Sequence, residues 1–160
     1  MYANSGPRVA YLIGASGGLG SGIAAAFVEA GWSVGLGGRE ASALDRLREG
    51  LPGGKSSVAA VDATDASEIR GVFDRWRTEL GPPDACLCLV GAYLGGKRPD
   101  DWTAAEWRAQ FEANLLAPAM VLGQAFAALR DATRPGLLVA VSALAGVESP
   151  AGKLPYGATK

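Results

Sequence analysis

Tyr156 and Lys160 stand four residues apart and could together handle a proton. On a helix this spacing puts both side chains on one face, one turn apart. A nearby ammonium group favours the tyrosinate, so the phenol could donate or accept a proton near neutral pH. Such a pair is common by chance, so its meaning depends on the rest of the chain.

A glycine-rich turn near the N-terminus could hold a phosphate group. It separates an apolar run at 8–13, an expected strand, from an expected helix at 21–30. Glycines let a ligand approach the backbone closely, and a helix N-terminus attracts anions. Any tight strand-to-helix turn can be rich in glycine, but this position favours a nucleotide. The residues expected to bind it are Gly14, Ser16, Gly17, Gly18, Leu19 and Gly20.

Arg39 follows an expected strand at 32–36, where a dinucleotide-binding sheet would meet the adenosine ribose. An acidic residue ending that strand would bind the 2′-hydroxyl of NAD, whereas a guanidinium can bind the 2′-phosphate of NADP. Here the strand is followed by Gly37 and Gly38. The sequence therefore favours NADP(H) over NAD(H), with a solvated surface arginine as the alternative.

Asp62 and Ala63 follow the expected strand at 57–61 and form a second candidate contact with the cofactor. The Asp62 carboxylate could accept a hydrogen bond from an adenine amino group. It could instead shape the turn before a helix that Thr64 or Asp65 caps. The two roles are compatible.

Asn114 lies in an expected long helix, four residues before Pro118. Proline has no N–H to donate to the carbonyl four residues back, and its ring crowds that carbonyl. The sequence thus predicts a kink and a freed carbonyl at Asn114, where a water molecule could bind. An incidental kink with a solvated asparagine is the alternative.

Strand-like and helix-like segments alternate along the chain and would position these residues. Strands are expected at 8–13, 32–36, 57–61, 85–90 and 137–141, and helices at 21–30, 41–49, 67–80 and 103–130, the last opened by a capping box of Thr103 and Glu106. The alternation predicts an α/β fold, a doubly wound parallel sheet of Rossmann type forming a single domain over 1–160. Ligands of such sheets bind at the carboxyl ends of the strands, where the motifs fall.

Composition excludes several other classes of function. The net charge of −1 gives no general attraction to nucleic acid or anionic membranes, and no apolar run approaches ~18 residues. No signal peptide is visible, so the cytoplasm is the expected location. The chain has no histidine, which excludes Ser-His-Asp and Cys-His hydrolysis. Cys86 and Cys88 alternate on one strand, where a disulfide is unfavourable, and we expect two buried thiols and no metal site.

Taken together, these residues resemble the short-chain dehydrogenase/reductase family over nearly the whole chain. The resemblance implies that Tyr156 is the catalytic acid/base, that Lys160 holds the nicotinamide ribose and tunes the tyrosine, and that the Asn114 carbonyl positions a relay water. It also places Gly91 beside the cofactor. The implied partner is a small-molecule substrate, with a homo-oligomer for a full-length form.

The sequence departs from the family pattern at the serine that steadies the substrate oxygen. The family serine lies 13 positions before the tyrosine, where this chain has Ala143. Ser142 is adjacent, but a shift of one residue along a strand turns the side chain to the other face. Without a bulge, Ser142 is not expected to replace it. Removing one such donor typically costs ~3 kcal/mol of transition-state stabilisation.

Two further departures concern the segment after the fourth strand and the length of the chain. The family's Asn-Asn-Ala-Gly is Cys88-Leu89-Val90-Gly91 here, and its continuation to Lys97 looks like the quinoid dihydropteridine reductase branch, which acts on a ring imine but prefers NADH. The chain also resembles a C-terminally truncated member, lacking the later strands and helices. On that view Lys160 would lie in a frayed terminus, and the fifth strand would expose an apolar face that favours association.

Three functions therefore compete. The leading one is hydride transfer between NADP(H) and a carbonyl, alcohol or imine carbon, with Tyr156 handling the proton. A non-catalytic dinucleotide-binding module is the second, favoured by Ala143 and the lost asparagines. An inactive fragment is the third.

Overall fold

Five parallel strands form the sheet of the computed structural model, which describes residues 6–130, 135–148 and 150–160. The spatial order is β3-β2-β1-β4-β5, so the chain starts at the centre, builds outward to one edge and then crosses to the other side. The crossover leaves a crevice at the carboxyl ends of β1 and β4. The strands are β1 (Val9–Ile13), β2 (Ser33–Gly38), β3 (Ser56–Ala60), β4 (Ala85–Cys88) and β5 (Leu137–Ala140).

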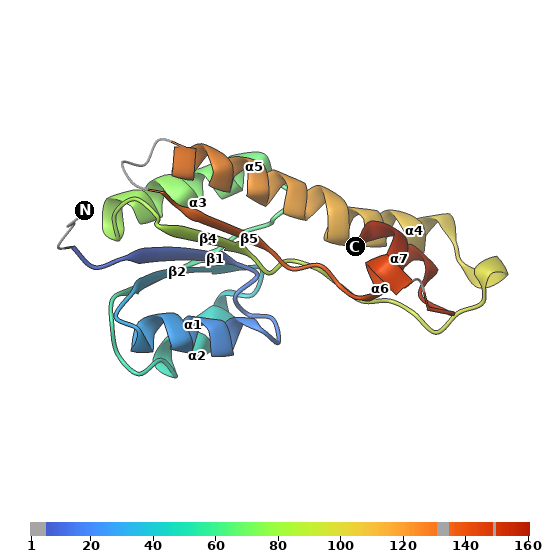
Figure 1. Ribbon diagram of the computed structural model, residues 1–160, viewed down its shortest axis with the longest axis horizontal. Helices are drawn as coiled ribbons and strands as arrows, with labels where there is room; N and C mark the ends of the chain where they lie inside the picture. Colours follow the sequence, from blue (N-terminus) through green and yellow to red (C-terminus); the bar gives the residue numbers. More distant parts are fainter. Residues whose placement is uncertain (1–5, 131–134, 149) are drawn as a thin grey trace.

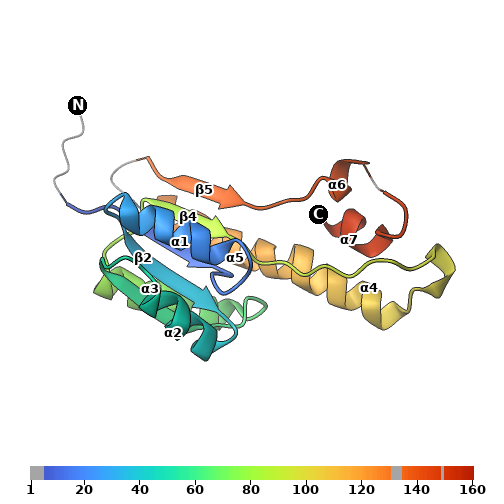
Figure 2. The ribbon, with the colours of Figure 1, turned by 90° about the horizontal axis from the view of Figure 1, so that it is seen from below.

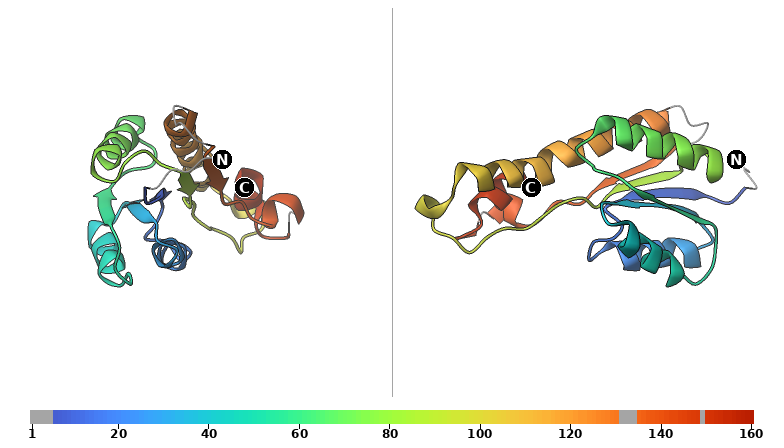
Figure 3. Two further views of the ribbon diagram at one scale, coloured as in Figure 1. Left: turned by 60° about the vertical axis from the view of Figure 1, so that its left-hand side comes forward. Right: turned by 180° about the vertical axis from the view of Figure 1, so that it is seen from behind.

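Helices cover both faces of this sheet, as the doubly wound prediction requires (Figure 1). One face carries α1 (Gly20–Glu29) and α2 (Ala41–Glu49), and the other carries α3 (Ala66–Glu79) and α5 (Ala117–Arg130). The end-on view of Figure 3 separates the two helical layers. The predicted fold class is therefore confirmed.

The central strands bury both of their faces because each face meets a helical layer. In β4, Cys86 and Cys88 pack into the cluster under α3 and α5, whereas Ala85 and Leu87 pack into the cluster under α1. The two cysteines thus share one face and are free thiols, as predicted. Burial raises the pKa of the Cys86 thiol to about 12, which keeps it protonated and unreactive.

Strand β2 runs further than the sequence predicts. It was expected to end at Leu36 but pairs with β1 through Gly37 and with β3 through Gly38. Glycine suits this strand because a neighbouring ring fills the space that a side chain would take. A Cβ atom on Gly35 would lie 2.6 Å from Cδ2 of Trp76, which is fully buried.

The predicted long helix is present but is interrupted by a wide turn. It consists of α4 (Ala104–Phe111), the π-helical turn η2 (Glu112–Leu116) and α5. The N–H of Ala117 bonds to the carbonyl of Glu112, five residues back, directly before Pro118. The irregularity before this proline is therefore a π turn, while the kink that the sequence predicts stays a prediction. The capping box of Thr103 and Glu106 at the start of α4 is confirmed.

This helix extends beyond the sheet and carries the last part of the chain beside it. Figure 2 shows the short helix α7 (Leu154–Thr159) next to α4 and the short helix α6 (Ala145–Glu148) next to α7, while α5 lies over the sheet. The segment after β4 is an extended loop that ends in the 3₁₀ turn η1 (Pro99–Asp101). By length and composition Ala104–Arg130 could also cross a membrane, a test that core helices of soluble proteins pass too.

Candidate functional site

The glycine turn after β1 is fixed against its neighbours on both sides. The N–H groups of Gly14 and Ala15 both donate to the carbonyl of Gly37, at 2.8 and 2.9 Å. Gly14 has a φ of 90°, and a Cβ atom there would lie 2.8 Å from the backbone of Leu89. Glycine is therefore required at position 14 for both conformation and space.

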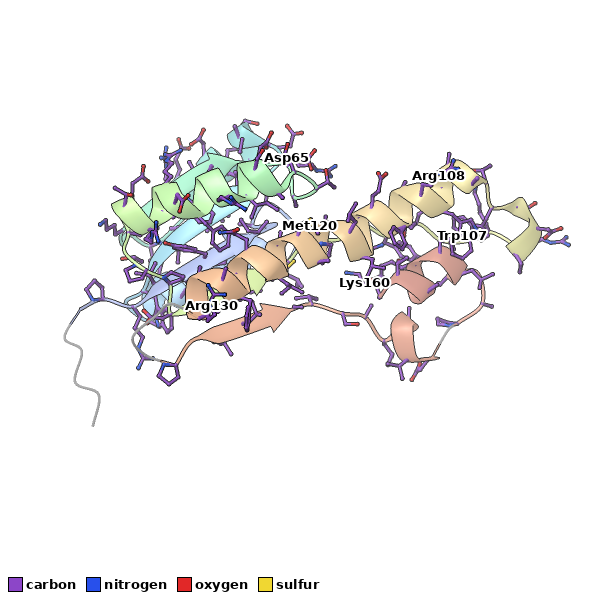
Figure 4. The ribbon with its side chains drawn as sticks, turned by 90° about the horizontal axis from the view of Figure 1, so that it is seen from above. Asp65, Trp107, Arg108, Met120, Arg130 and Lys160 are labelled. Carbon is purple, nitrogen blue, oxygen red and sulfur yellow. The ribbon has the colours of Figure 1, made fainter. Side chains whose placement is uncertain are left out.

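The N-terminus of α1 leaves room for an anion. No side chain caps this helix, and its first turn contains no acidic residue. By contrast, Asp65 caps α3 with its own carboxylate, at the helix end labelled in Figure 4. A Cβ atom on Gly18 would meet nothing within 4 Å. The residues of the turn thus fit a diphosphate, because free N–H groups, the helix dipole and open space coincide.

A hollow of about 540 Å³ joins this turn to the ends of β2 and β3. Most of the residues predicted from separate motifs to bind a cofactor line it. These are Gly14, Ser16, Gly17, Arg39, Asp62, Ala63 and Gly91. A separate surface depression of about 720 Å³ lies on the outer side of Arg39 and Asp62, along α3, and includes none of the turn.

Asp62 performs the structural role that the sequence allowed and still lines the cofactor hollow. Its Oδ1 accepts hydrogen bonds from the N–H and the hydroxyl of Thr64, at 2.8 and 2.7 Å. These bonds, the backbone one first, hold the pKa of the Asp62 carboxyl below its usual value. Asp62 therefore stays ionised as a hydrogen-bond acceptor, while Asp65 is the residue that caps α3.

A second hollow, of about 390 Å³, brings the other end of the chain onto the same turn. The expected residues in its lining come from the turn, from the loop after β4 and from α7. They are Gly14, Gly17, Gly18, Leu19, Gly91, Tyr156 and Lys160. Tyr156 and Lys160 thus face the glycine turn, although about 140 residues separate them from it in the chain. The Lys160 ammonium lies 5.9 Å from the centre of the Tyr156 ring.

Lys160 is held in place, contrary to the expected frayed terminus. Its Nζ donates to the carbonyl of Val141 at 3.4 Å, and its own carbonyl accepts from the Ser142 hydroxyl at 2.6 Å. Figure 4 places Lys160 between α7 and the middle of the long helix. Burial lowers the pKa of the Lys160 ammonium, with a smaller opposing effect from Cys88. The sequence could not show these bonds, because Val141 and Ser142 belong to another segment.

Gly91 explains how the lysine and the asparagine can meet. A Cβ atom at this position would lie 2.6 Å from Nζ of Lys160 and 3.0 Å from Oδ1 of Asn114. Any side chain here would push the ammonium away from the loop. Gly91 is therefore the residue that lets the two predicted catalytic groups share one point of the loop.

Asn114 is buried on the π turn and bonds to the loop after β4. Its Oδ1 accepts from the N–H of Ala92 at 2.9 Å, and its Nδ2 donates to the carbonyl of Ala92 at 2.8 Å and to Gln110 at 3.2 Å. The side chain thus has a structural role that the sequence did not reveal. The water site at the Asn114 carbonyl stays a prediction.

Two residues of the site were not among those predicted. Tyr93 lines the second hollow and packs against Tyr156, and Gln110 supports Asn114. The only signal for Tyr93 was a large aromatic residue among small ones in the segment 91–96. Ser142 also lines this hollow, whereas Ala143 does not. The Ser142 hydroxyl, however, donates its hydrogen bond to the Lys160 carbonyl.

Comparison with known proteins matches both the sequence and the fold. A family model described as short chain dehydrogenase matches residues 8–160. The uncharacterized oxidoreductase YvrD of Bacillus subtilis is 27% identical over 154 residues, which cover 96% of this chain and 57% of YvrD. The chain spans 60% or less of the length of the curated relatives it matches.

The fold resembles solved structures of proteins with bound NAD+ and of proteins with bound NADPH. NAD+-bound xylitol dehydrogenase matches with a TM-score of 0.87 at 22% identity, over 96% of this chain and 59% of that one, a likeness that shows the fold alone. An actinorhodin polyketide ketoreductase variant with NADPH matches with a TM-score of 0.84 at 25% identity, over 99% and 61% of the two chains.

Proposed function

The chain belongs to the short-chain dehydrogenase family, and from this premise we propose that the protein is an NADP(H)-dependent oxidoreductase acting on a carbonyl, alcohol or imine carbon. One observation carries the proposal. The hollow at Arg39 and Asp62 and the hollow at Tyr156 and Lys160 meet at the same glycines, Gly14, Gly17 and Gly91. An extended dinucleotide could therefore reach from one to the other across the turn.

The residues that would hold the cofactor follow from this arrangement. The uncapped start of α1 and the turn would bind the diphosphate, Arg39 and Asp62 the adenosine end, and Lys160 the nicotinamide ribose. The bound nicotinamide would supply or accept the hydride. Among the described residues, the lining of the two hollows contains no cysteine, and Cys86 and Cys88 lie in the core.

We propose a preference for NADP(H) on the environment of Arg39. Arg39 lines the hollow beside Gly38, where an added Cβ atom would come within 2.8 Å of the Ser16 hydroxyl. An acidic side chain at position 38, of the kind that binds a 2′-hydroxyl, would have to displace the Ser16 hydroxyl of the glycine turn. Glu40 also lines the hollow, so the preference depends on the arginine and not on a positive surface.

Tyr156 is the proposed proton donor and acceptor. In the reducing direction its phenolic O–H would pass a proton to the substrate oxygen or nitrogen as hydride reaches the adjoining carbon, and the reverse would hold for oxidation. The Lys160 ammonium, fixed by Val141, would stabilise the phenolate that remains. At Ala143 no hydroxyl is available, so this chain would stabilise a developing oxyanion less well than the family pattern, by ~3 kcal/mol.

The substrate class, the cellular location and the self-association of the protein are further proposals. We propose a small-molecule substrate, a cytoplasmic location and self-association of the protein. Large apolar side chains exposed along the long helix and β5 support association, because such patches usually mark an interface. They are Trp107, Phe111, Leu115, Leu116, Phe126, Leu137 and Leu138. Exposure of β5 was expected from the sequence and is confirmed.

The experiment that tests the activity is NADPH oxidation with a panel of carbonyl compounds, comparing the wild type with Tyr156→Phe. We expect the variant to lose about 10²- to 10⁴-fold in kcat while NADP+ binding is kept. Tyr11→Phe is the matched control, because Tyr11 is a core residue whose hydroxyl binds the Gly81 carbonyl. Equal rates for wild type and Tyr156→Phe would refute the role of Tyr156. NADP+ binding without turnover by the wild type would favour the non-catalytic module.

Cofactor preference is tested separately by calorimetry with NADP+ and NAD+. Arg39→Ala should weaken NADP+ binding by about tenfold to a hundredfold, the worth of a charge-assisted hydrogen bond or two, and leave NAD+ binding nearly unchanged. Arg98→Ala, at an exposed arginine beyond both hollows, is the control. Equal loss for both cofactors would contradict a contact with the 2′-phosphate.

A further inference from the structure

Tyr93 stands beside the proposed proton donor with most of its ring uncovered. Its ring meets that of Tyr156 edge to face, with centroids 5.0 Å apart and an interplanar angle of 90°. This is a favourable geometry for two aromatic rings. Tyr93 nevertheless remains 59% exposed, and it lines the hollow that contains Tyr156 and Lys160.

Neighbouring residues of the loop determine where the Tyr93 ring lies. A Cβ atom on Gly95 would clash with the Tyr93 hydroxyl, so a side chain at position 95 would displace the ring from this place. Gly96, with a φ of +87°, donates its N–H to the carbonyl of Gly152 at 2.8 Å. This bond ties the loop to the segment that leads into α7, the helix that carries Tyr156. Figure 2 shows the loop running beside α6 and α7.

A cation on the same segment contacts the ring as well. The Lys153 ammonium lies 5.9 Å from the centre of the Tyr93 ring, at the residue that precedes α7. Tyr156 and Lys153 therefore both pack on the Tyr93 ring. More than half of Tyr93 stays exposed all the same, and the residue lines the same hollow as Tyr156.

We propose that Tyr93 is the substrate-contacting wall of this site and that it gives preference to substrates whose reacting carbon is attached to a planar ring. The inference rests on the proposed oxidoreductase function and deepens it by naming the substrate class. Removing water from an exposed aromatic face costs little free energy. A flat substrate ring can stack on that face and makes more contact with it than a flexible chain of equal size does.

The test compares acetophenone with 2-octanone, two ketones with the same number of carbons but only one planar ring. For each we would measure kcat/KM with NADPH for the wild type, Tyr93→Leu and Tyr93→Phe. Tyr93→Leu should reduce the preference for acetophenone about three- to tenfold, and Tyr93→Phe should keep it, because the ring is what matters. Phe126→Leu, at an exposed aromatic on α5 outside both hollows, should leave the preference unchanged.

A second measurement separates this inference from the proposed function. Binding of acetophenone and 2-octanone to the protein with NADP+ present is followed by saturation-transfer NMR, which needs no turnover. If the wild type turns over neither ketone but binds acetophenone preferentially, and Tyr93→Leu abolishes that preference, the function fails and the aromatic wall stands. If the wild type shows no preference in either assay, or if Tyr93→Leu weakens both ketones equally, the wall is refuted.

Discussion

The side chain of Asn114 bonds to both backbone groups of Ala92, as a neighbouring strand would. Its Oδ1 accepts the Ala92 N–H at 2.9 Å, and its Nδ2 donates to the Ala92 carbonyl at 2.8 Å. This pair joins the π turn of the long helix to the loop after β4. It thereby fixes Gly91, which lies next in the chain and against the Lys160 ammonium. The helix irregularity and the site are thus parts of one arrangement.

Replacing Asn114 by leucine should therefore destabilise the protein. The side chain keeps its approximate size, but Ala92 loses two hydrogen bonds of about 0.5–1.5 kcal/mol each. We expect a loss of about 1–3 kcal/mol in the free energy of unfolding, measured by urea denaturation followed by circular dichroism. Gln124→Leu on α5 is the control and should stay within about 0.5 kcal/mol of the wild type. Equal effects of the two changes would contradict the Ala92 pair as the cause.

Gly35 and Trp76 form a second dependent pair, in the core. A Cβ atom on Gly35 would lie 2.6 Å from Trp76, whose ring is held by Tyr11 and Phe73, with centroids 5.1 and 6.2 Å away. Because these rings leave no room to move, Gly35→Ala should cost about 1–3 kcal/mol of unfolding free energy. The cost should shrink when Trp76→Phe makes space, giving a coupling of at least about 0.5 kcal/mol in a double-mutant cycle.

Gly71→Ala provides the matched control for this cycle. A Cβ atom on Gly71 would meet nothing within 4 Å, and the residue lies inside α3. This change should raise the stability by up to about 1 kcal/mol, because alanine favours a helix more than glycine does. If Gly35→Ala proved as harmless as Gly71→Ala, the close packing of Trp76 on β2 would be refuted.

The sequence predicted those parts of the structure that depend on neighbouring residues. The alternation of strands and helices, the capping box at Thr103 and the shared face of Cys86 and Cys88 follow from local periodicity and hydrogen bonding. Pro118 predicted a kink, because a missing N–H affects the residue four positions back, and the structure has a π turn directly before this proline. Each of these needed no knowledge of how distant segments pack.

The parts that could not be predicted depend on contacts between distant segments. Strand β2 pairs with β3 through Gly38, and Trp76 from α3 fills the space beside Gly35 and Gly37. Lys160 is fixed by Val141 and Ser142, and Tyr93 is placed against Tyr156 by the Gly96–Gly152 bond. Motifs therefore predicted the candidate site residues, whereas packing between distant segments determines what holds Lys160 and what lies beside Tyr156.

Glu106 at the start of α4 should make the stability depend on pH in the acidic range. The Lys97 ammonium, which bonds its carboxylate, and then the Thr103 backbone N–H hold the pKa of Glu106 at about 2, against an ordinary 4.5. The folded protein thus binds this proton more weakly than the unfolded chain does. The stabilisation is fully present above pH 4.5 and is lost as the pH falls towards 2.

The measurement is the unfolding free energy of the wild type and of Glu106→Gln across this pH range. The advantage of the wild type should shrink between pH 4.5 and about 2, because the neutral glutamine has no charge to lose. Lys97→Met should narrow the window, since it removes the largest cause of the low pKa. Arg98→Met, at a neighbouring cation that pairs with Asp100 instead, should not. A wild-type advantage that stays constant throughout would mean that the Glu106 charge contributes nothing to the folded state.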